Sequence, residues 1–439
     1  MPAKLISFHA LGRNTGTPRI WLENQRLAHL GFTPGRRVAI RGLASNRLSV
    51  EPAPTGLKIC SRGKIPIIDI CSLTRLSALA TFEQIKVIGT PGRLVITPSI
   101  QGFYIARSRT PRATFRVLEL CAGGGTLHTA IASHPEFTVV GAAEFNQAFA
   151  NEYGKKAPEA DLIIGDIRRI NPREYPDHDV VVAGFPCTDM SCLGRVKKRL
   201  GGRPEDGKQS DVFLPILAVV AARMPRAVVL ENVPQIASSH TAMIIRRFFA
   251  TLGYHVSEHV LNAHAGFGDI QRRSRWCLIA TLNPGFRLRI PDTPSKETAG
   301  AYLDAPDDTR DREDAARIAA TIAGLDKRRE AHRARGNDFR YYTINGDSRE
   351  VPTLTKSMHK INQGPFVETS AGLRMPRKAE LERIAGHTVE SSSYPLTCQI
   401  LGQGVSVRMF SEIFRQLGAF LRGQEAAVDR FGQLSLFDD

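Results

Sequence analysis

The sequence lacks long apolar runs, paired cysteines and, near its N-terminus, acidic residues. None of its apolar stretches approaches the roughly 18–20 residues that span a bilayer, and no signal-peptide core follows Met1. We therefore expect a cytoplasmic protein without a transmembrane segment. Its 439 residues, 42% hydrophobic and 23% charged, are enough for two or three globular domains.

The seven cysteines are scattered, with no CxxC pair and no regular spacing. This excludes a disulfide scaffold or a zinc site and indicates a reducing compartment, in which a cysteine can act as a thiol. The sequence also has no Gly-Lys-Ser/Thr run, which argues against a triphosphate-binding loop.

Acidic residues are scarce only in the first quarter of the chain. Residues 1–116 hold 18 Lys and Arg against 4 Asp and Glu, whereas the rest holds 41 against 39. Positive charge that served only solubility would be distributed evenly along the chain. The concentrated charge instead predicts a polyanionic partner, namely a nucleic acid.

Residues 1–112 contain short strand patterns separated by Gly and Pro, and the pattern occurs twice, over residues 18–50 and 64–96. Each copy predicts a strand, a short helix, a strand, a turn and a strand. The first copy carries the run Leu30-Gly31-Phe32. The pattern resembles the swapped-hairpin family of transition-state regulators and antitoxins, especially its toxin-like, SymE-like branch. That resemblance implies a DNA-binding unit built from both copies; the alternative is an unrelated all-β module.

From residue 114 the chain alternates strands and helices, which predicts an α/β fold with a doubly wound sheet. The predicted strands cover residues 115–120, 138–143, 162–165, 179–183 and 227–230. In such sheets ligands bind at the carboxyl ends of the strands. Those ends carry, in order, a glycine cluster, Glu144, Asp166, Cys187 and Glu231.

These strand ends suit a nucleotide-like ligand and a reactive ring. The glycine cluster allows close backbone approach, Glu144 suits a ribose diol, and Asp166 with Ile167 suits the edge and face of an adenine. Cys187 could add to an electron-poor ring while Glu231 bonds a ring nitrogen. A cysteine after a strand is, taken alone, more often a small buried residue.

The chain after residue 113 resembles the cytosine-5 DNA methyltransferase family. The resemblance rests on eight motifs in the family's order: Glu119–Gly125, Glu144 with Asn146, Asp166, Gly184-Phe185-Pro186-Cys187, Glu231-Asn232-Val233, Gln271–Arg275, Arg374–Glu380 and Leu401–Val405.

The resemblance implies a mechanism on a cytosine flipped out of double-stranded DNA. Cys187 would add to carbon 6, Glu231 would hold ring nitrogen 3 and Arg275 the exocyclic oxygen, with Arg273 in the same catalytic group. Carbon 5 would take a methyl group from S-adenosyl-L-methionine. The loop 191–208 would close over the base. Taken alone, Arg273 and Arg275 could equally be salt-bridged scaffold residues.

The residues expected to bind this cofactor are Leu120, Cys121, Ala122, Gly123, Gly125, Thr126, Glu144, Phe145, Asp166, Ile167, Pro186, Gln403 and Val405. Two of them depart from the family, which usually has Phe at the position of Cys121 and Asn at that of Gln403. Thr188 and Met190 likewise replace the commoner Gln and Phe. None of these changes removes a group that performs chemistry.

We expect five segments: a basic β-rich DNA-binding domain (1–112), a catalytic part (113–281), a small target-recognition region (282–372), a second catalytic part (373–423) and a flexible tail (424–439). Within the target-recognition region, Pro352–Thr355 resembles the family's Thr-Leu contact near the flipped base. In the tail, Gln433–Phe437 resembles the peptide that docks on the bacterial replicative sliding clamp. The alternative for the tail is an apolar end that folds back on the body.

The leading hypothesis is a DNA cytosine-5 methyltransferase of the restriction-modification type, associated with the nucleoid. Two alternatives stay open. One is a DNA-binding transcriptional regulator with a non-catalytic methyltransferase scaffold, and the other is an RNA cytosine-5 methyltransferase.

Overall fold

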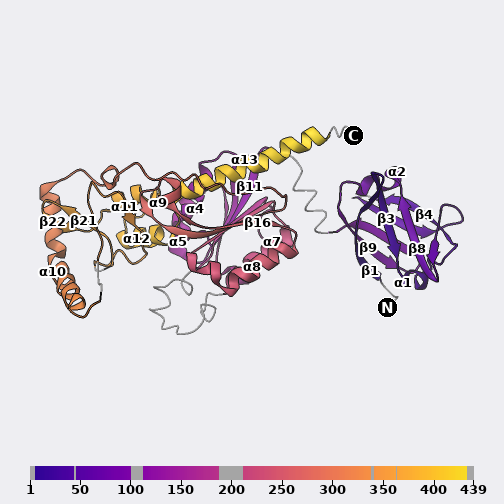
Figure 1. Cartoon of the computed structure of the whole chain (residues 1–439), viewed down its shortest axis with the longest axis horizontal. Coiled ribbons are helices and arrows are strands. Elements are labelled where there is room, and N and C mark those ends of the chain that lie inside the picture. Colours follow the sequence, from indigo (N-terminus) through magenta and orange to yellow (C-terminus); the bar gives the residue numbers. More distant parts are fainter. Residues whose placement is uncertain are drawn as a thin grey trace. The chain divides into compact units, whose positions relative to one another are not determined.

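The computed structural model describes residues 5–43, 46–99, 112–186, 211–337, 341–361 and 363–432, with side chains up to 423. The chain divides into two compact units, Met1–Thr110 and Pro111–Asp439 (Figure 1). Cys187, Thr188, Met190, the loop 191–208 and the clamp-like peptide 433–437 lie outside the described residues.

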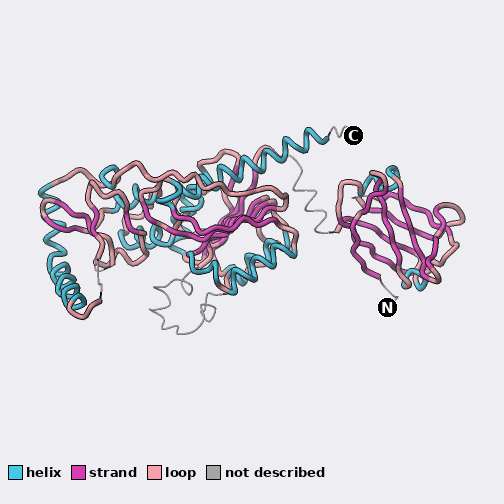
Figure 2. Tube along the Cα trace, in the orientation of Figure 1, coloured by secondary structure: helices cyan, strands magenta, loops and turns pink. Residues whose placement is uncertain are grey.

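The N-terminal unit consists mainly of strands (Figure 2), and the predicted order of elements is confirmed in both copies. The first copy comprises β3 (Thr17–Glu23), α1 (Arg26–His29), β4 (Arg37–Leu43) and β5 (Arg47–Pro52). The second comprises β8 (Ile65–Cys71), α2 (Leu73–Leu76), η1 (Ser77–Leu79), β9 (Gln84–Thr90) and β10 (Arg93–Pro98). Short strands flank them: β1 (Leu5–Ala10), β2 (Gly12–Asn14), β6 (Leu57–Lys58) and β7 (Cys60–Arg62).

The two copies interlock in two sheets, ordered β1-β9-β10-β5-β4-β6 and β2-β3-β8-β7. Each order is symmetric about its centre, where β5 pairs with β10 and β3 pairs with β8. In the smaller sheet Ile20 faces Ile70 and Leu22 faces Ile68. Both copies contribute to one buried cluster, in which Val38 and Ile85 hold equivalent places. The core therefore needs both copies.

The second unit is built on a seven-stranded sheet ordered β13-β12-β11-β14-β15-β18-β16. β18 alone runs antiparallel to its two neighbours, and the other pairings within this sheet are parallel. The strands are β11 (Phe115–Leu120), β12 (Phe137–Glu144), β13 (Asp161–Ile164), β14 (Val180–Gly184), β15 (Ala227–Asn232), β16 (His255–Asn262) and β18 (Ser274–Thr281). The predicted doubly wound α/β fold is confirmed.

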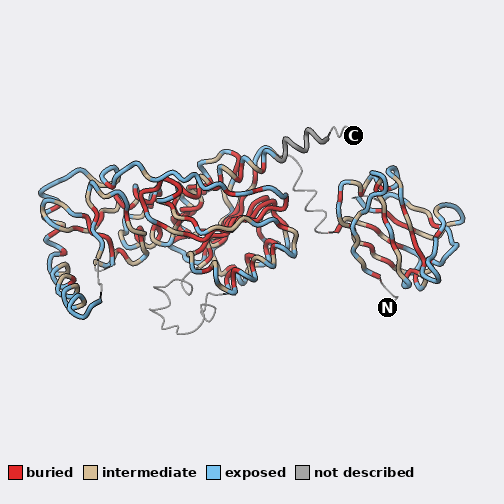
Figure 3. Tube along the Cα trace, in the orientation of Figure 1, coloured by how far each residue is buried: buried red, intermediate tan, exposed pale blue. Residues whose placement is uncertain are grey.

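Helices cover both faces of this sheet, as Figure 1 shows for α13 on one side and α7 and α8 on the other. The helices are α4 (Thr126–Ala132), α5 (Gln147–Lys156), α7 (Phe213–Arg223), α8 (His240–Thr251), α9 (Ala263–Phe267) and α13 (Val407–Gly432). Because the central strands are covered on both sides, they are continuously buried (Figure 3).

The predicted target-recognition region (282–372) contains the long helix α10 (Asp308–Arg333) and contributes strands to two small sheets. One sheet pairs β17 (Gln271–Arg272) with β20 (Val351–Pro352). The other joins β19 (Thr343–Ile344), β21 (Phe366–Thr369) and β22 (Gly372–Arg374). Helices α11 (Lys378–Ala385) and α12 (Tyr394–Gln403) follow.

The sequence predicts a last helix from about Met409 to Leu421, and this end is wrong, because α13 continues to Gly432. The helix continues past Gly423, because the residues from Gln424 to Arg430 include neither proline nor glycine and contain good helix formers. Among the described residues, none of the helices has the length and apolarity needed to cross a membrane.

Candidate active site

The candidate site begins in the loop between β11 and α4. Cys121, Gly123 and Gly125 have φ angles of 55°, 60° and 88°, so the backbone turns through the left-handed region three times. That conformation is strained for Cys121, which is not a glycine. A Cβ at Gly124 would lie 2.5 Å from Cγ2 of Ile400, so α12 packs directly against the loop.

Glu144, at the end of β12, ties this loop to the neighbouring strand. Its buried carboxylate accepts hydrogen bonds from the Gly123 amide (2.8 Å) and the Asn146 amide (2.8 Å), one on each oxygen. Each oxygen keeps a second lone pair that can accept a hydroxyl. The next side chain, Phe145, is 72% exposed and offers a flat apolar surface at the same edge.

Asp166 follows β13 and is already paired. Arg168 bonds both carboxylate oxygens, at 2.9 and 2.6 Å, and its backbone amide adds a third bond. The Arg168 guanidinium therefore lowers the pKa of Asp166. The carboxylate stays ionised, and each of its oxygens accepts two hydrogen bonds from Arg168. Ile167 beside it is buried.

The predicted acid lies beside the strand that leads to the predicted nucleophile. Gly184 of β14 pairs in register with Glu231 of β15. A Cβ at Gly184 would lie 3.1 Å from Oε2 of Glu231, which leaves little room for a larger residue. Cys187 follows Gly184 by three positions in the sequence.

Asn232 holds the segment before Cys187 in place. Its buried side-chain amide donates to the Phe185 carbonyl at 3.0 Å, while its oxygen accepts from the Val233 amide at 2.8 Å. The sequence identified Asn232 only as part of a motif. An amide that follows an apolar run and an acid at the end of a strand was the signal available for this role.

Glu231 forms a buried ion pair with Arg275 of β18, with 2.7 Å between Oε1 and Nε. Burial raises the pKa of Glu231, and the positive charges of Arg275 and Arg273 oppose that rise. The Arg275 guanidinium also donates to the Ser274 carbonyl. The structure thus brings two predicted catalytic residues, Glu231 and Arg275, into direct contact.

Arg273 is almost fully buried and is directed at backbone carbonyls. It donates to Leu354 at 2.9 Å, to Gly402 at 3.0 Å and to Gly404. Gln271 completes the same junction, because its side-chain oxygen accepts from the Leu354 amide at 3.3 Å. Arg273 therefore joins the predicted target-recognition region to the segment after α12.

The segment after α12 returns to the glycine loop. The Val405 amide donates to the Thr126 hydroxyl at 3.2 Å, and a Cβ at Gly404 would lie 2.5 Å from Cγ2 of Thr126. Gln403 is exposed beside it. Leu120 and Ala122 are buried and support the loop from below. Predicted cofactor-binding residues from the beginning and from the end of the second unit thus lie next to one another.

His387 is a contact that sequence reasoning missed. It lies just after α11, is buried, and bonds the Gly124 carbonyl at 3.1 Å and the Thr129 hydroxyl at 2.8 Å. Burial lowers the pKa of His387 to about 4. No pattern in the sequence pointed to this residue.

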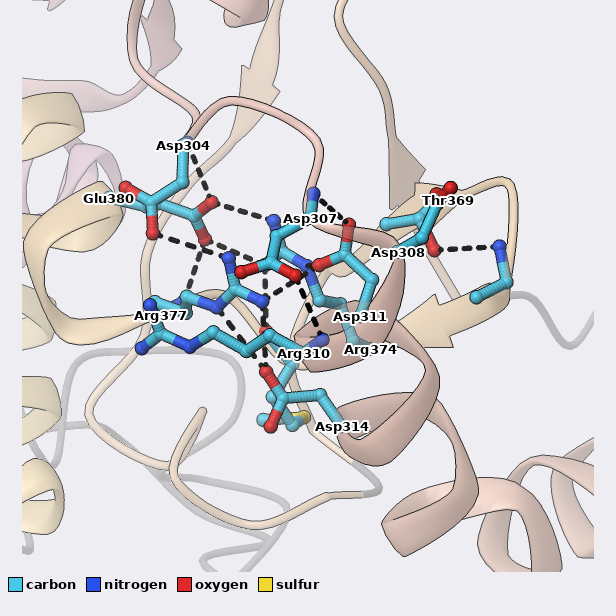
Figure 4. Close-up of polar contacts among 12 residues, drawn as sticks. Asp304, Asp307, Asp308, Arg310, Asp311, Asp314, Thr369, Arg374, Arg377 and Glu380 are labelled. Atoms are coloured by element: carbon cyan, nitrogen blue, oxygen red, sulfur yellow. Dashed lines mark hydrogen bonds and ion pairs between the residues drawn. The ribbon is translucent and has the colours of Figure 1, made fainter.

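A buried ion network holds the target-recognition region to α11 (Figure 4). Arg374 bonds Asp311 of α10 at 2.9 Å and both oxygens of Glu380 at 2.7 and 2.8 Å. Arg377 adds contacts to Asp311 at 2.7 Å and to Asp314 at 3.2 Å. Figure 4 shows these side chains converging from the start of α10, from β22 and from α11.

Comparison with known proteins gives a consistent result. The family described as C-5 cytosine-specific DNA methylase matches residues 115–418. The type II methyltransferase M.Bsp6I of Bacillus sp. (strain RFL6) is 30% identical over 266 residues, covering 55% of this chain and 80% of the relative. M.NlaX of Neisseria lactamica is 27% identical over 320 residues, covering 70% and 97%.

Solved structures agree on the fold. The Entamoeba histolytica methyltransferase EhMeth superposes with a TM-score of 0.58 at 15% identity, covering 71% of this chain and 99% of that one. The S. pombe Dnmt2 methyltransferase superposes with a TM-score of 0.56 at 20% identity, covering 70% of this chain and 98% of that one.

Proposed function

Because this chain belongs to the C-5 cytosine-specific DNA methylase family, we propose that it transfers a methyl group from S-adenosyl-L-methionine to carbon 5 of a cytosine flipped out of duplex DNA. The observation that carries this proposal is the buried Glu231–Arg275 pair, positioned in register beside the strand that runs into Cys187.

The residues at the sheet edge fit the cofactor. Glu144 has free lone pairs for two ribose hydroxyls, and Phe145 offers a face for an adenine. Asp166 would accept from the adenine amino group in place of one of its bonds from Arg168. The loop 121–125 approaches without bulky side chains. When bound there, S-adenosyl-L-methionine supplies an electrophilic methyl group.

The catalytic residues act on the cytosine ring. We infer that the Cys187 thiolate forms a bond to carbon 6, so that the electrons of the ring double bond become available at carbon 5. Burial raises the pKa of Glu231, which helps this side chain to share a proton with ring nitrogen 3 as charge develops there. Arg275 holds Glu231 and can donate to the exocyclic oxygen. Once carbon 5 has taken the methyl group, loss of its proton to a base re-forms the ring double bond and expels the Cys187 thiolate, and ring nitrogen 3 returns its proton to Glu231.

Arg273 has a different part in this proposal. Its donors are directed at the carbonyls of Leu354, Gly402 and Gly404, so it positions the target-recognition region against the cofactor loop. It is a positioning residue, whereas Cys187, Glu231 and Arg275 are the catalytic residues.

The test is expression in a host without cytosine methylation, followed by bisulfite sequencing of its DNA. We expect 5-methylcytosine at a defined sequence in the wild type and none with Cys187→Ala or Glu231→Gln. No new methylation from a folded wild type would refute the proposal in favour of a non-catalytic scaffold. Methylation of RNA but not DNA would identify an RNA enzyme.

We also propose that the peptide Gln433–Phe437 docks on the sliding clamp, as its sequence match suggests. With the clamp as bait, Leu436→Ala/Phe437→Ala should abolish capture of the full chain. Capture that persists would assign the contact elsewhere.

A further inference from the structure

The outer face of the six-stranded sheet in the N-terminal unit is strongly cationic. Inward and outward side chains alternate along each strand, and the register identifies those that share the outer face. Among the described residues this face carries six cations, Arg37, Arg41, Arg47, Lys58, Lys86 and Arg93, and one acid, Glu51. We call this surface the basic face.

The other sheet of the same unit is electrically balanced. Its described outer side chains include two cations and two acids, and they pair with one another. Arg19 bonds Asp69 at 2.8 Å, and Arg62 lies 3.6 Å from Glu23. Of the two sheet faces, only the basic face therefore carries an excess of positive charge, which general solubility does not explain.

The internal repeat provides a second comparison. β4 and β9 are equivalent strands, and their inward residues are alike: Val38 corresponds to Ile85, and Gly42 to Gly89. Their outward residues differ, because Arg37 and Arg41 of β4 correspond to Gln84 and Ile88 of β9. Folding requires the inward residues, so the arginines of the first copy are not needed to build the strand.

Like charges also lie next to one another on the basic face. Arg37 is paired directly across from Lys58, and both side chains are exposed. Like charges in directly opposite positions destabilise a sheet unless an anion offsets them. Along β4, Arg37 and Arg41 are about 13 Å apart, which spreads the charge over several phosphates of a duplex.

From these observations we propose that the basic face binds the phosphate backbone of duplex DNA. This binding does not depend on the base sequence of the DNA or on the catalytic site. This rests on the proposed function only for the choice of duplex DNA as the polyanion. The face supplies cations for phosphates, which position a protein on DNA without reading bases. It therefore strengthens binding to any duplex and leaves target choice to the second unit.

The test uses the full chain and a duplex made only of A·T base pairs, which contains no cytosine for the catalytic site. A face variant, Arg37→Gln/Arg41→Gln/Lys58→Gln, is compared with a control variant, Arg13→Gln/Arg26→Gln/Arg75→Gln. Both remove three exposed cations from the same unit, but the control residues lie outside the basic face. Glutamine is already present at the equivalent of Arg37, namely Gln84.

Affinity is measured over roughly 50 to 200 mM salt. We expect the slope of log K against log salt to fall by about 2 to 3 for the face variant, because each lost phosphate contact removes about 0.9. The control variant should keep the wild-type slope. Thermal unfolding of each protein checks that it is folded. If the triple face variant does not fold, the single variant Lys58→Gln replaces it, and its salt slope should fall by about 0.9.

Three results would overturn the proposal. An unchanged slope for the folded face variant would remove the basic face from DNA binding. Equal losses in both variants would mean that net charge alone matters. A salt slope that responds to the face variant on duplex RNA but not on duplex DNA would identify RNA as the partner. Because no methyl transfer is measured, failure here is distinct from failure of the proposed catalytic function.

Discussion

At the scale of single residues, the sequence predicts those that would act on a ligand, but it gave no sign of those that hold them in place. Glu231 and Arg275 were expected in one site, and the structure places them 2.7 Å apart. Asn232 was quoted without a role, and His387 was not noticed. Both bind backbone carbonyls, and a carbonyl is present at every residue, so the sequence gives no sign of which one a side chain will meet.

His387 is neutral and has a defined tautomer. The Gly124 carbonyl only accepts hydrogen bonds, so Nε2 carries the proton and Nδ1 accepts from the Thr129 hydroxyl. His387 thereby fixes the carbonyl of the glycine that Ile400 packs against. It is a positioning residue for the proposed cofactor loop.

We predict that His387→Phe weakens S-adenosyl-L-methionine binding about ten-fold, which corresponds to about 1.4 kcal/mol, because Gly124 loses its buried donor. The Michaelis constant for the cofactor should rise while kcat changes little. His387→Gln, which retains a side-chain N–H, should restore part of the affinity. A fall in kcat at an unchanged Michaelis constant would contradict the positioning role.

The same residue predicts a pH effect on stability. Burial holds the pKa of His387 at about 4, below its ordinary value of 6.5, and Lys156 and His128 nearby also disfavour its charged form, whereas Glu152 favours it. Its contribution is therefore complete above about pH 6.5 and is lost as the pH falls through 4. The Tm difference between the wild type and His387→Gln should shrink over that interval. A constant difference would show that His387 does not titrate as described.

At the scale of secondary-structure elements, predictions succeeded where burial dominates. Strands such as β14 and β15 are covered on both faces, so their apolar runs mark them in the sequence. The end of α13 was missed because Gly423, a residue that commonly follows the end of a helix, lies inside this one. How α10 is attached could not be foreseen, because Asp311 and Arg374 meet only after the chain folds back over 63 positions.

We predict that Arg374→Met lowers the free energy of unfolding of the second unit by about 3 to 5 kcal/mol, because it leaves Asp311 and Glu380 buried with one cation fewer. Denaturant unfolding measures this change. The matched control is Arg415→Met, which removes an exposed partner of Glu412 on α13 and should cost less than about 1 kcal/mol. Similar losses for the two variants would show that the network does not anchor α10.

At the scale of the whole molecule, the two units divide the charge unequally. The sequence alone showed that residues 1–116 carry most of the excess positive charge. It could not show which surface carries it, because that depends on strand register: a shift by one residue would turn Arg37 and Arg41 into the core. The strand register therefore determines that these cations lie together on the basic face.

This division predicts how methylation depends on DNA length. If the basic face holds DNA while the second unit works, a long duplex can contact both units, which raises the local concentration of target sites. A duplex that covers only the catalytic site gains nothing from the face.

We therefore expect the face variant to lose methylation of long DNA at lower salt than the wild type, whereas the two proteins methylate a minimal duplex equally. Methyl incorporation measured against salt on both substrates gives the comparison, with the control variant following the wild type. A face variant that is impaired equally on both duplexes would mean that these cations serve the catalytic unit itself.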